Sequence, residues 1–250
     1  MRGGRRWRGG LVRGWAPVWS VCLLLSSIGC DAMPGRPDPA NRPLRPEQVK
    51  DFDVLYARNC AGCHGADGIL GAARSLRDPL YLAWIDSTNL RLILEQGVYG
   101  TLMPAFAIFH GGNLTEEQIG ILVTGMRERW GQSGEFSAGS LPPYAAAPGD
   151  PRAGAAVYAE FCSHCHGPGG EGGSVPGSIV DPSYLSLMSN QALRSVVVAG
   201  RNDLGMPDYR SVLRGRVMSD EQIDDVVAWL IDHRVEFPGQ PFTSKEENDG

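Results

Sequence analysis

Two copies of a C-x-x-C-H pattern are the most distinctive chemical feature of the sequence. They occupy residues 60–64 (CAGCH) and residues 162–166 (CSHCH). Two thiols three residues apart, followed directly by an imidazole, form the pattern that attaches a c-type haem: each thiol adds to a haem vinyl group, and the histidine lies under the iron. We therefore predict two haem c groups bound covalently by four thiols: Cys60, Cys63, Cys162 and Cys165. His64 and His166 would then be the proximal iron ligands.

Paired cysteines have two other common uses. Two C-x-x-C pairs can supply four thiolates to zinc, and a pair can form a disulfide in an oxidising compartment. Zinc is disfavoured because a histidine follows each pair and each pair belongs to its own copy of a repeated unit. A disulfide within each pair would leave both histidines without a role. Haem attachment accounts for all six side chains.

A methionine in each copy is the expected sixth iron ligand. Met103 lies 39 residues after His64, Met206 lies 40 residues after His166, and a proline follows each methionine. A methionine ligand completes the coordination sphere and raises the reduction potential, whereas an open position would admit peroxide or gas chemistry. Three further methionines have no counterpart in the other copy and are expected to fill the core: Met126, Met188 and Met218.

The order of these landmarks indicates a tandem duplication. The C-x-x-C-H motifs are 102 residues apart and the Met-Pro loops 103, while the segments 115–119 and 219–223 are 104 apart. Landmarks that keep their order, with a drift of one residue between them, indicate two copies of one folding unit.

Each copy is expected to be helical. Apolar residues at helical spacing lead into the motifs over residues 47–60 and 152–162. Thr115 and Ser219 precede acidic residues and are the expected N-caps of a closing helix. A short helix should begin near Asn89, between loops rich in Gly and Pro. No stretch alternates long enough to form a sheet, so the predicted fold class is all-α, with two tandem helical domains.

Composition divides the chain into six parts. The segment before the first copy holds five prolines and should be an extended spacer, and the segment between the copies is rich in Gly, Ser, Ala and Pro. As a flexible coil, the second of these would span about 25 Å. We expect a signal peptide over 1–29, a lipid anchor and spacer over 30–46, a first domain over 47–130, a linker over 131–150, a second domain over 151–238 and a polar tail over 239–250.

The N-terminus carries an export signal. Five arginines precede an apolar run over residues 18–28, which is too short to cross a membrane and suits a signal peptide. The segment 27–30 (SIGC) resembles the bacterial lipoprotein box, with serine where an aliphatic residue is usual. The resemblance implies acylation of Cys30 and a location on the periplasmic face of the cytoplasmic membrane. The alternative is an ordinary signal peptide that leaves a soluble periplasmic protein.

Charge restricts the partners. Removal of residues 1–29 takes away five of the 23 basic residues and none of the 28 acidic ones, so the formal net charge changes from −5 to −10. A chain this acidic is not expected to bind nucleic acid, and it favours redox partners with basic docking faces.

Each copy resembles a class I cytochrome c domain. In that family the first and last helices cross closely, with a small residue on the first and an aromatic residue on the last. The second copy matches, with Gly154 and Trp229. The first copy has Phe52 and Gly125 at these positions, so we predict that the large and small residues have exchanged places and fill the same crossing.

The resemblance also bears on the histidines. The ring N–H of a proximal histidine normally bonds a backbone carbonyl, often that of a proline. Pro176 is the candidate in the second copy, whereas residues 72–73 of the first copy are alanines. The remaining histidines are expected to be solvated: His110, His164 and His233.

The resemblance implies electron transfer through two haems between a redox donor and an acceptor. Two other functions stay open: a permanent cytochrome subunit of a larger respiratory membrane complex, and a dihaem peroxidase-like enzyme. The enzyme would need one haem with an open or displaceable ligand, whereas each copy offers a methionine at the matching position.

Overall fold

The computed structural model describes residues 38, 41–132, 136, 140–174 and 176–235. The chain divides into two compact units, Met1–Arg45 and Pro46–Gly250. The expected signal peptide, Cys30 and the polar tail lie outside the described residues. Within the described ranges, no helix combines the length and apolar character needed to cross a bilayer.

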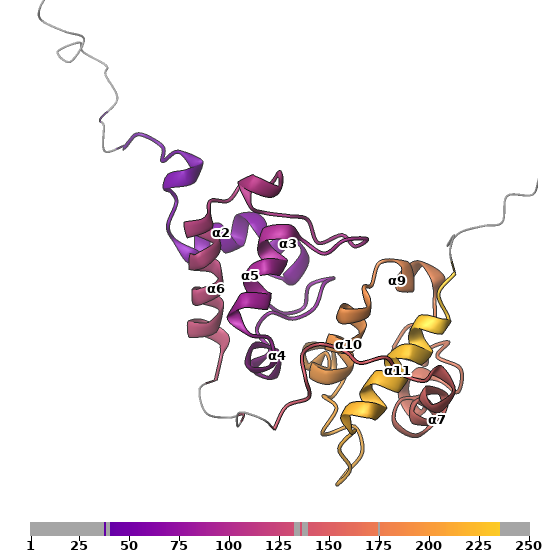
Figure 1. The fold of residues 1–250 in the computed structure, drawn as a ribbon. Helices are drawn as coiled ribbons and strands as arrows, with labels where there is room; N and C mark the ends of the chain where they lie inside the picture. The colour runs from indigo at the N-terminus through magenta and orange to yellow at the C-terminus, as the bar shows by residue number, and fades with distance from the viewer. Residues whose placement is uncertain (1–37, 39–40, 133–135, 137–139, 175, 236–250) are drawn as a thin grey trace, which may run out of the picture. The chain divides into compact units, whose positions relative to one another are not determined.

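The described residues of the second unit form helices and isolated bridges, without a β-strand, which confirms the all-α prediction. The helices of the first copy (Figure 1) are η3 (Pro46–Gln48), α2 (Phe52–Asn59), α3 (Ala61–His64), α4 (Pro79–Trp84), α5 (Ser87–Gln96), η4 (Ile108–His110) and α6 (Glu116–Trp130). Those of the second are α7 (Pro151–Phe161), α8 (Ser163–His166), α9 (Pro182–Ser186), α10 (Asn190–Ala199), η5 (Asn202–Leu204) and α11 (Asp220–Asp232).

The first helix of the first copy is shorter than predicted. It begins at Phe52 instead of Glu47, because Asp51 has an extended backbone and its carboxylate accepts a hydrogen bond from the N–H of Val54 at 2.9 Å. This is the geometry of an N-cap, which ends the helix on its N-terminal side. The preceding residues form the 3₁₀ turn η3 instead.

Two short helices, α4 and α9, were not predicted. Each starts with an aspartate N-cap followed by a proline at the first helical position: Asp78-Pro79 in α4 and Asp181-Pro182 in α9. Proline is favoured there because its missing N–H would have had no partner and its φ angle already suits a helix. The Asp-Pro pair was therefore a readable start signal in both copies.

The closing helices α6 and α11 begin as predicted. Thr115 and Ser219 both form complete capping boxes, with Gln118 and Gln222 respectively at the third helical position. In each box the hydroxyl accepts from the glutamine N–H, and the glutamine side chain accepts from the N–H of the cap residue. These boxes fix the start of the helix that crosses the first helix of each copy.

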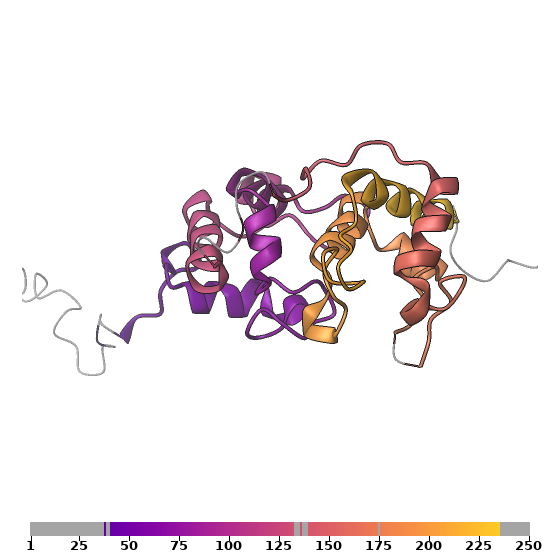
Figure 2. The same ribbon diagram turned by 90° about the horizontal axis from the view of Figure 1, so that it is seen from below.

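The two helix crossings have the exchanged volumes that the sequence predicts. The α7 and α11 helices lie side by side in both views (Figures 1 and 2). A Cβ added to Gly154 of α7 would lie 2.1 Å from the carbonyl oxygen of Asp225 and 2.8 Å from Cβ of Trp229. At the α2–α6 crossing, a Cβ on Gly125 would lie 2.2 Å from the ring of Phe52. Glycine is therefore required on opposite helices in the two copies.

Trp130 takes the place of Trp229 in the first copy, although it lies about a turn further along its helix than the repeat register predicts. Its ring meets the ring of Tyr56 edge-on with centroids 5.1 Å apart, whereas Trp229 stacks on Tyr158 at 4.0 Å. The tip of each tryptophan also approaches an equivalent glycine of its own copy. A Cβ on Gly68 would lie 3.0 Å from Trp130, and one on Gly170 would lie 3.4 Å from Trp229. The aromatic contact is thus kept while the crossing is repacked.

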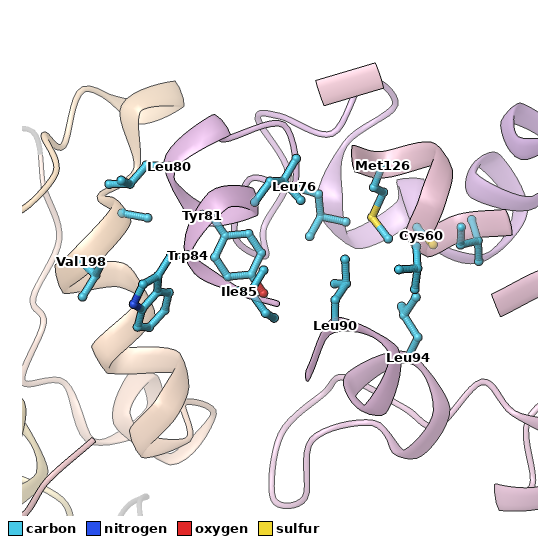
Figure 3. Packing of buried hydrophobic residues seen from close by; sticks show 14 of the residues in the cluster. Cys60, Leu76, Leu80, Tyr81, Trp84, Ile85, Leu90, Leu94, Met126 and Val198 are labelled. Carbon is cyan, nitrogen blue, oxygen red and sulfur yellow. The ribbon is translucent and has the colours of Figure 1, made fainter. Parts of the chain in front are cut away.

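The two copies share one hydrophobic core. The larger cluster of buried residues includes members of both, among them Tyr56, Trp84, Tyr158 and Val198. Figure 3 shows Trp84 and Leu80 of α4 beside Val198 of α10. A shared core makes Pro46–Gly250 one compact unit, in keeping with its contact pattern.

The described part of the linker is bound to the fold. The carbonyl of Pro142 accepts a hydrogen bond from the indole of Trp84 at 2.7 Å, and that of Pro143 accepts one from Arg194 at 2.9 Å. The carbonyl of Tyr144 accepts from Gln191 at 2.8 Å. The prediction that residues 131–150 form a flexible coil is therefore wrong for this stretch.

Candidate haem sites

Both C-x-x-C-H motifs form the same helical turn. In the first, the N–H of Cys60 donates to the carbonyl of Tyr56 at 2.8 Å, and the N–H of His64 donates to that of Cys60 at 3.0 Å. The corresponding bonds of Cys162 and His166 have the same lengths. Residues three and four apart on a helix share a face. The structure therefore brings both thiols and the histidine of each motif together.

The four thiols are unpaired with one another. Burial, and secondarily the neighbouring thiol, raises the pKa of Cys60 and of Cys162 to about 12. Both side chains are then neutral thiols at pH 7 in the protein alone. Among the described residues there is no cluster of three or more His, Cys, Asp or Glu that could hold a metal ion. The zinc alternative thus has no structural support there.

His64 is oriented as a proximal ligand requires. Its Nδ1 lies 2.8 Å from the carbonyl oxygen of Arg74, which fixes Nδ1 as the donor and leaves Nε2 with its lone pair. Burial lowers the pKa of His64, and the positive charges of Arg74 and Arg201 lower it further. The acceptor is thus neither of the two alanines at 72–73 but the residue that follows them.

His166 lacks the partner expected for it. Its Nδ1 is buried and has no hydrogen-bond partner among the described residues, and the carbonyl of Pro176 accepts instead from the N–H of Gly173 at 2.9 Å. Burial, with a smaller contribution from His164, lowers the pKa of His166. The hypothesis that Pro176 orients His166 is wrong for this structure, and the second site has the less fixed proximal ligand.

The two methionine loops are closed in the same way. The carbonyl of Met103 accepts from the N–H of Val98, and that of Met206 accepts from the N–H of Arg201, both at 3.0 Å. The glycine before each donor has φ of +70°, and a Cβ on it would lie 2.6 Å from the methionine carbonyl. Only glycine fits such a turn. Met103 also packs against the core cluster that contains Cys60.

The remaining expectations were partly met. His110 and His164 are exposed, as predicted. His233 is half-buried, with its Nδ1 2.8 Å from the carbonyl of Trp229 and its ring 4.4 Å from the indole, so the solvated assignment is wrong. The three core-filling methionines are confirmed: Met126 and Met218 are buried, and Met188 packs against the smaller cluster.

Three side chains near the sites were missed by sequence reasoning: Arg74, Trp130 and Arg201. A search for aromatics within one turn of the repeat register would have found Trp130. Arg74 and Arg201 have no counterpart of the same type in the other copy, so repeat comparison gave no signal for them.

The all-α fold and the paired C-x-x-C-H turns define a c-type cytochrome. The family model described as "Cytochrome C oxidase, cbb3-type, subunit III" matches residues 47–124 and 149–230, and the chain belongs to this family. No curated protein sequence matches the chain. A solved chain from the "Kuenenia stuttgartiensis reducing HAO-like protein complex Kustc0457/Kustc0458" is similar over 78% of this chain and 100% of its own, with 19% identity and a TM-score of 0.46.

The residues present fit haem c. Each motif presents two thiols and a histidine on one helical turn, and His64 has the tautomer that an iron ligand needs. Membership of the family implies haem-based electron transfer. When bound, a haem supplies a single-electron couple between ferrous and ferric iron, while the protein supplies attachment, axial ligands and a low-dielectric surrounding.

Proposed function

We propose that this chain is a dihaem electron carrier. Cys60 and Cys63 hold one haem, and the equivalent pair of the second copy holds the other. The axial pairs are His64 with Met103 and His166 with Met206. The observation that carries the proposal is that both copies build the same motif turn and the same glycine-closed methionine loop. Two filled coordination spheres suit electron transfer better than turnover of a small substrate.

The proposal is tested by removing one attachment site at a time. In the variant C60S/C63S and in C162S/C165S, the haem content per chain should fall to half that of the wild type, because each pair holds its own haem. The measurement is the absorbance of the pyridine haem complex relative to protein mass. A variant that keeps the full haem content, or a pair of variants that both lose all haem while remaining folded, would contradict independent attachment.

The partners are proposed to be a redox donor and an acceptor within a respiratory membrane complex. The name of the family, subunit III of a cbb3-type oxidase, favours permanent membership of such a complex over a free carrier. Sizing after extraction in a mild detergent separates the two: a subunit should elute with haem-containing partners, and a free carrier should elute alone.

We further propose that the chain is anchored to the periplasmic face of the cytoplasmic membrane through an acylated Cys30. The lipoprotein-like segment 27–30 supports this. Several acyl chains on one cysteine would give stable anchoring. In the variant C30S the haem protein should move from the membrane to the soluble periplasmic fraction. An unchanged membrane fraction would exclude the acyl anchor as the sole attachment.

A further inference from the structure

An ion pair of the second copy joins the loops of the two haem sites. Arg201 and Asp203 form a two-pronged pair, with Nε–Oδ1 and Nη2–Oδ2 distances of 2.8 and 2.9 Å. Their side chains are 14% and 3% exposed, so the pair is largely removed from water. The second oxygen of Asp203 accepts from the N–H of Leu70 at 2.9 Å, and Arg201 donates to the carbonyl of Gly71 at 3.1 Å. Both acceptor and donor lie in the loop after the first C-x-x-C-H motif.

Gly71 lies directly against that motif. A Cβ on Gly71 would be 2.3 Å from the carbonyl oxygen of Cys63 and 2.5 Å from the carbonyl carbon of His64. Arg201 therefore holds a residue whose backbone is packed directly against the motif. A displacement of Gly71 would be transmitted to the backbone of His64 by contact.

Arg201 also closes the loop that presents Met206. Its N–H donates to the carbonyl of Met206, and its carbonyl accepts from the N–H of Met206, both at 3.0 Å. Arg201 thus bonds the Met206 loop of the second site through its backbone. Its side chain bonds the loop that follows the C-x-x-C-H motif of the first site.

The reverse connection runs through Arg74. Its carbonyl orients His64, while its guanidinium donates to the carbonyl of Ser195 in α10 at 2.8 Å. The α10 helix ends at Ala199, one glycine before Arg201. Arg74 therefore links the loop that orients His64 to the helix that leads into the Met206 loop.

The first copy shows that the ion pair is not needed to close a methionine loop. The residues at the positions of Arg201 and Asp203 are Val98 and Gly100. The loop of Met103 nevertheless closes through the N–H of Val98 with the same 3.0 Å bond. The ion pair is thus specific to the interface between the copies.

Building on the proposed two-haem function, we propose that Arg201 is a positioning residue that couples the two haem sites, so that a change of ligand or charge at one site shifts the reduction potential of the other. The carboxylate of Asp203 holds the guanidinium in a bidentate geometry that lysine cannot reproduce. The positive charge of the guanidinium, held at Gly71 against the backbone of His64, disfavours the ferric state of the first haem. Loss of Arg201 should therefore make that haem easier to oxidise.

The test uses the full chain with both haems and measures each midpoint potential by spectroelectrochemistry. In R201Q, the equilibrium between oxidised and reduced first haem should shift about threefold to tenfold toward oxidised, and tenfold is about 59 mV for one electron. R201K, which keeps the charge but loses the fork, should show a smaller shift. The matched control is R216Q, because Arg216 also pairs with a carboxylate of its own copy, that of Glu160. Its first-haem potential should equal that of the wild type.

Coupling itself is tested by a double-mutant cycle. M206A should shift the potential of the first haem in the wild-type background and have no such effect in the R201Q background. The coupling role of Arg201 is overturned if M206A shifts the potential of the first haem equally in both backgrounds, or if R201Q changes neither potential. In that case two bound haems would still support the proposed function. A wild type without covalent haem would instead overturn the proposed function. If R201Q fails to accumulate, R201K replaces it in the cycle, and the effect of M206A on the first haem should then be reduced; an unreduced effect would overturn the coupling role.

Discussion

The variant D224A is expected to lose about 3–5 kcal/mol of the free energy of unfolding, because it leaves a buried guanidinium without its carboxylate. The Arg194 side chain is 1% exposed and that of Asp224 is 9% exposed, and the two form an ion pair between α10 and α11. The remaining bond of the guanidinium is to the carbonyl of Pro143, a neutral acceptor in the linker. Among the described residues, this carboxylate is the one partner of opposite charge that contacts Arg194.

Chemical denaturation followed by circular dichroism measures this loss. E160A is the control, because Glu160 pairs with Arg216 at the surface and such pairs contribute about 1 kcal/mol or less. In the double variant R194M/D224A much of the loss should be recovered, since replacing both members of a buried pair by apolar groups is often neutral. Equal destabilisation by D224A and E160A would show that the buried pair has no special weight.

The variant F52G should destabilise the first copy by about 3–5 kcal/mol, because removal of the buried ring leaves a cavity. Phe52 is 8% exposed, stacks on Tyr56 with centroids 5.8 Å apart and lies against the bare backbone of Gly125. The ring fills the space beside Gly125 and meets the ring of Trp130 edge-on, with centroids 5.8 Å apart. Thermal unfolding by circular dichroism measures the effect.

Two further variants separate lost volume from other effects of F52G. F52L keeps most of the volume and should cost about 1 kcal/mol. G125A alone should be destabilising because its methyl group would meet the Phe52 ring at 2.2 Å, but it should be tolerated in F52G, where that ring is absent. If F52G melts like the wild type, the volume exchange at this crossing is not what stabilises the first copy.

Much of the site was predictable because it is local in sequence. The C-x-x-C-H turn needs five consecutive residues, and the capping boxes of Thr115 and Ser219 need four. Repeat comparison added the methionine loops, because a Met-Pro pair recurs at nearly the same distance after the motif histidine in both copies. These features depend on bonds between near neighbours, which sequence spacing reports directly.

What could not be predicted depends on contacts between distant segments. The linker was expected to be flexible from its composition, yet the carbonyl of Pro142 is bound by Trp84, 58 residues away. The acceptor for His64 is Arg74, whose guanidinium bonds Ser195, 121 residues further on. Polar side chains at an interface between copies have no periodicity and no counterpart in the repeat. The spatial equivalence of Trp130 and Trp229 likewise becomes visible only when both rings are seen against Tyr56 and Tyr158.

The central claim is that one chain carries two covalently attached haems, and intact mass spectrometry under denaturing conditions tests it most directly. Thioether bonds survive denaturation, whereas a haem held by axial ligands alone is lost. The account predicts a single species with the mass of the processed chain plus two haems. A species carrying one haem or none, from cells with a working haem-attachment pathway, would contradict it.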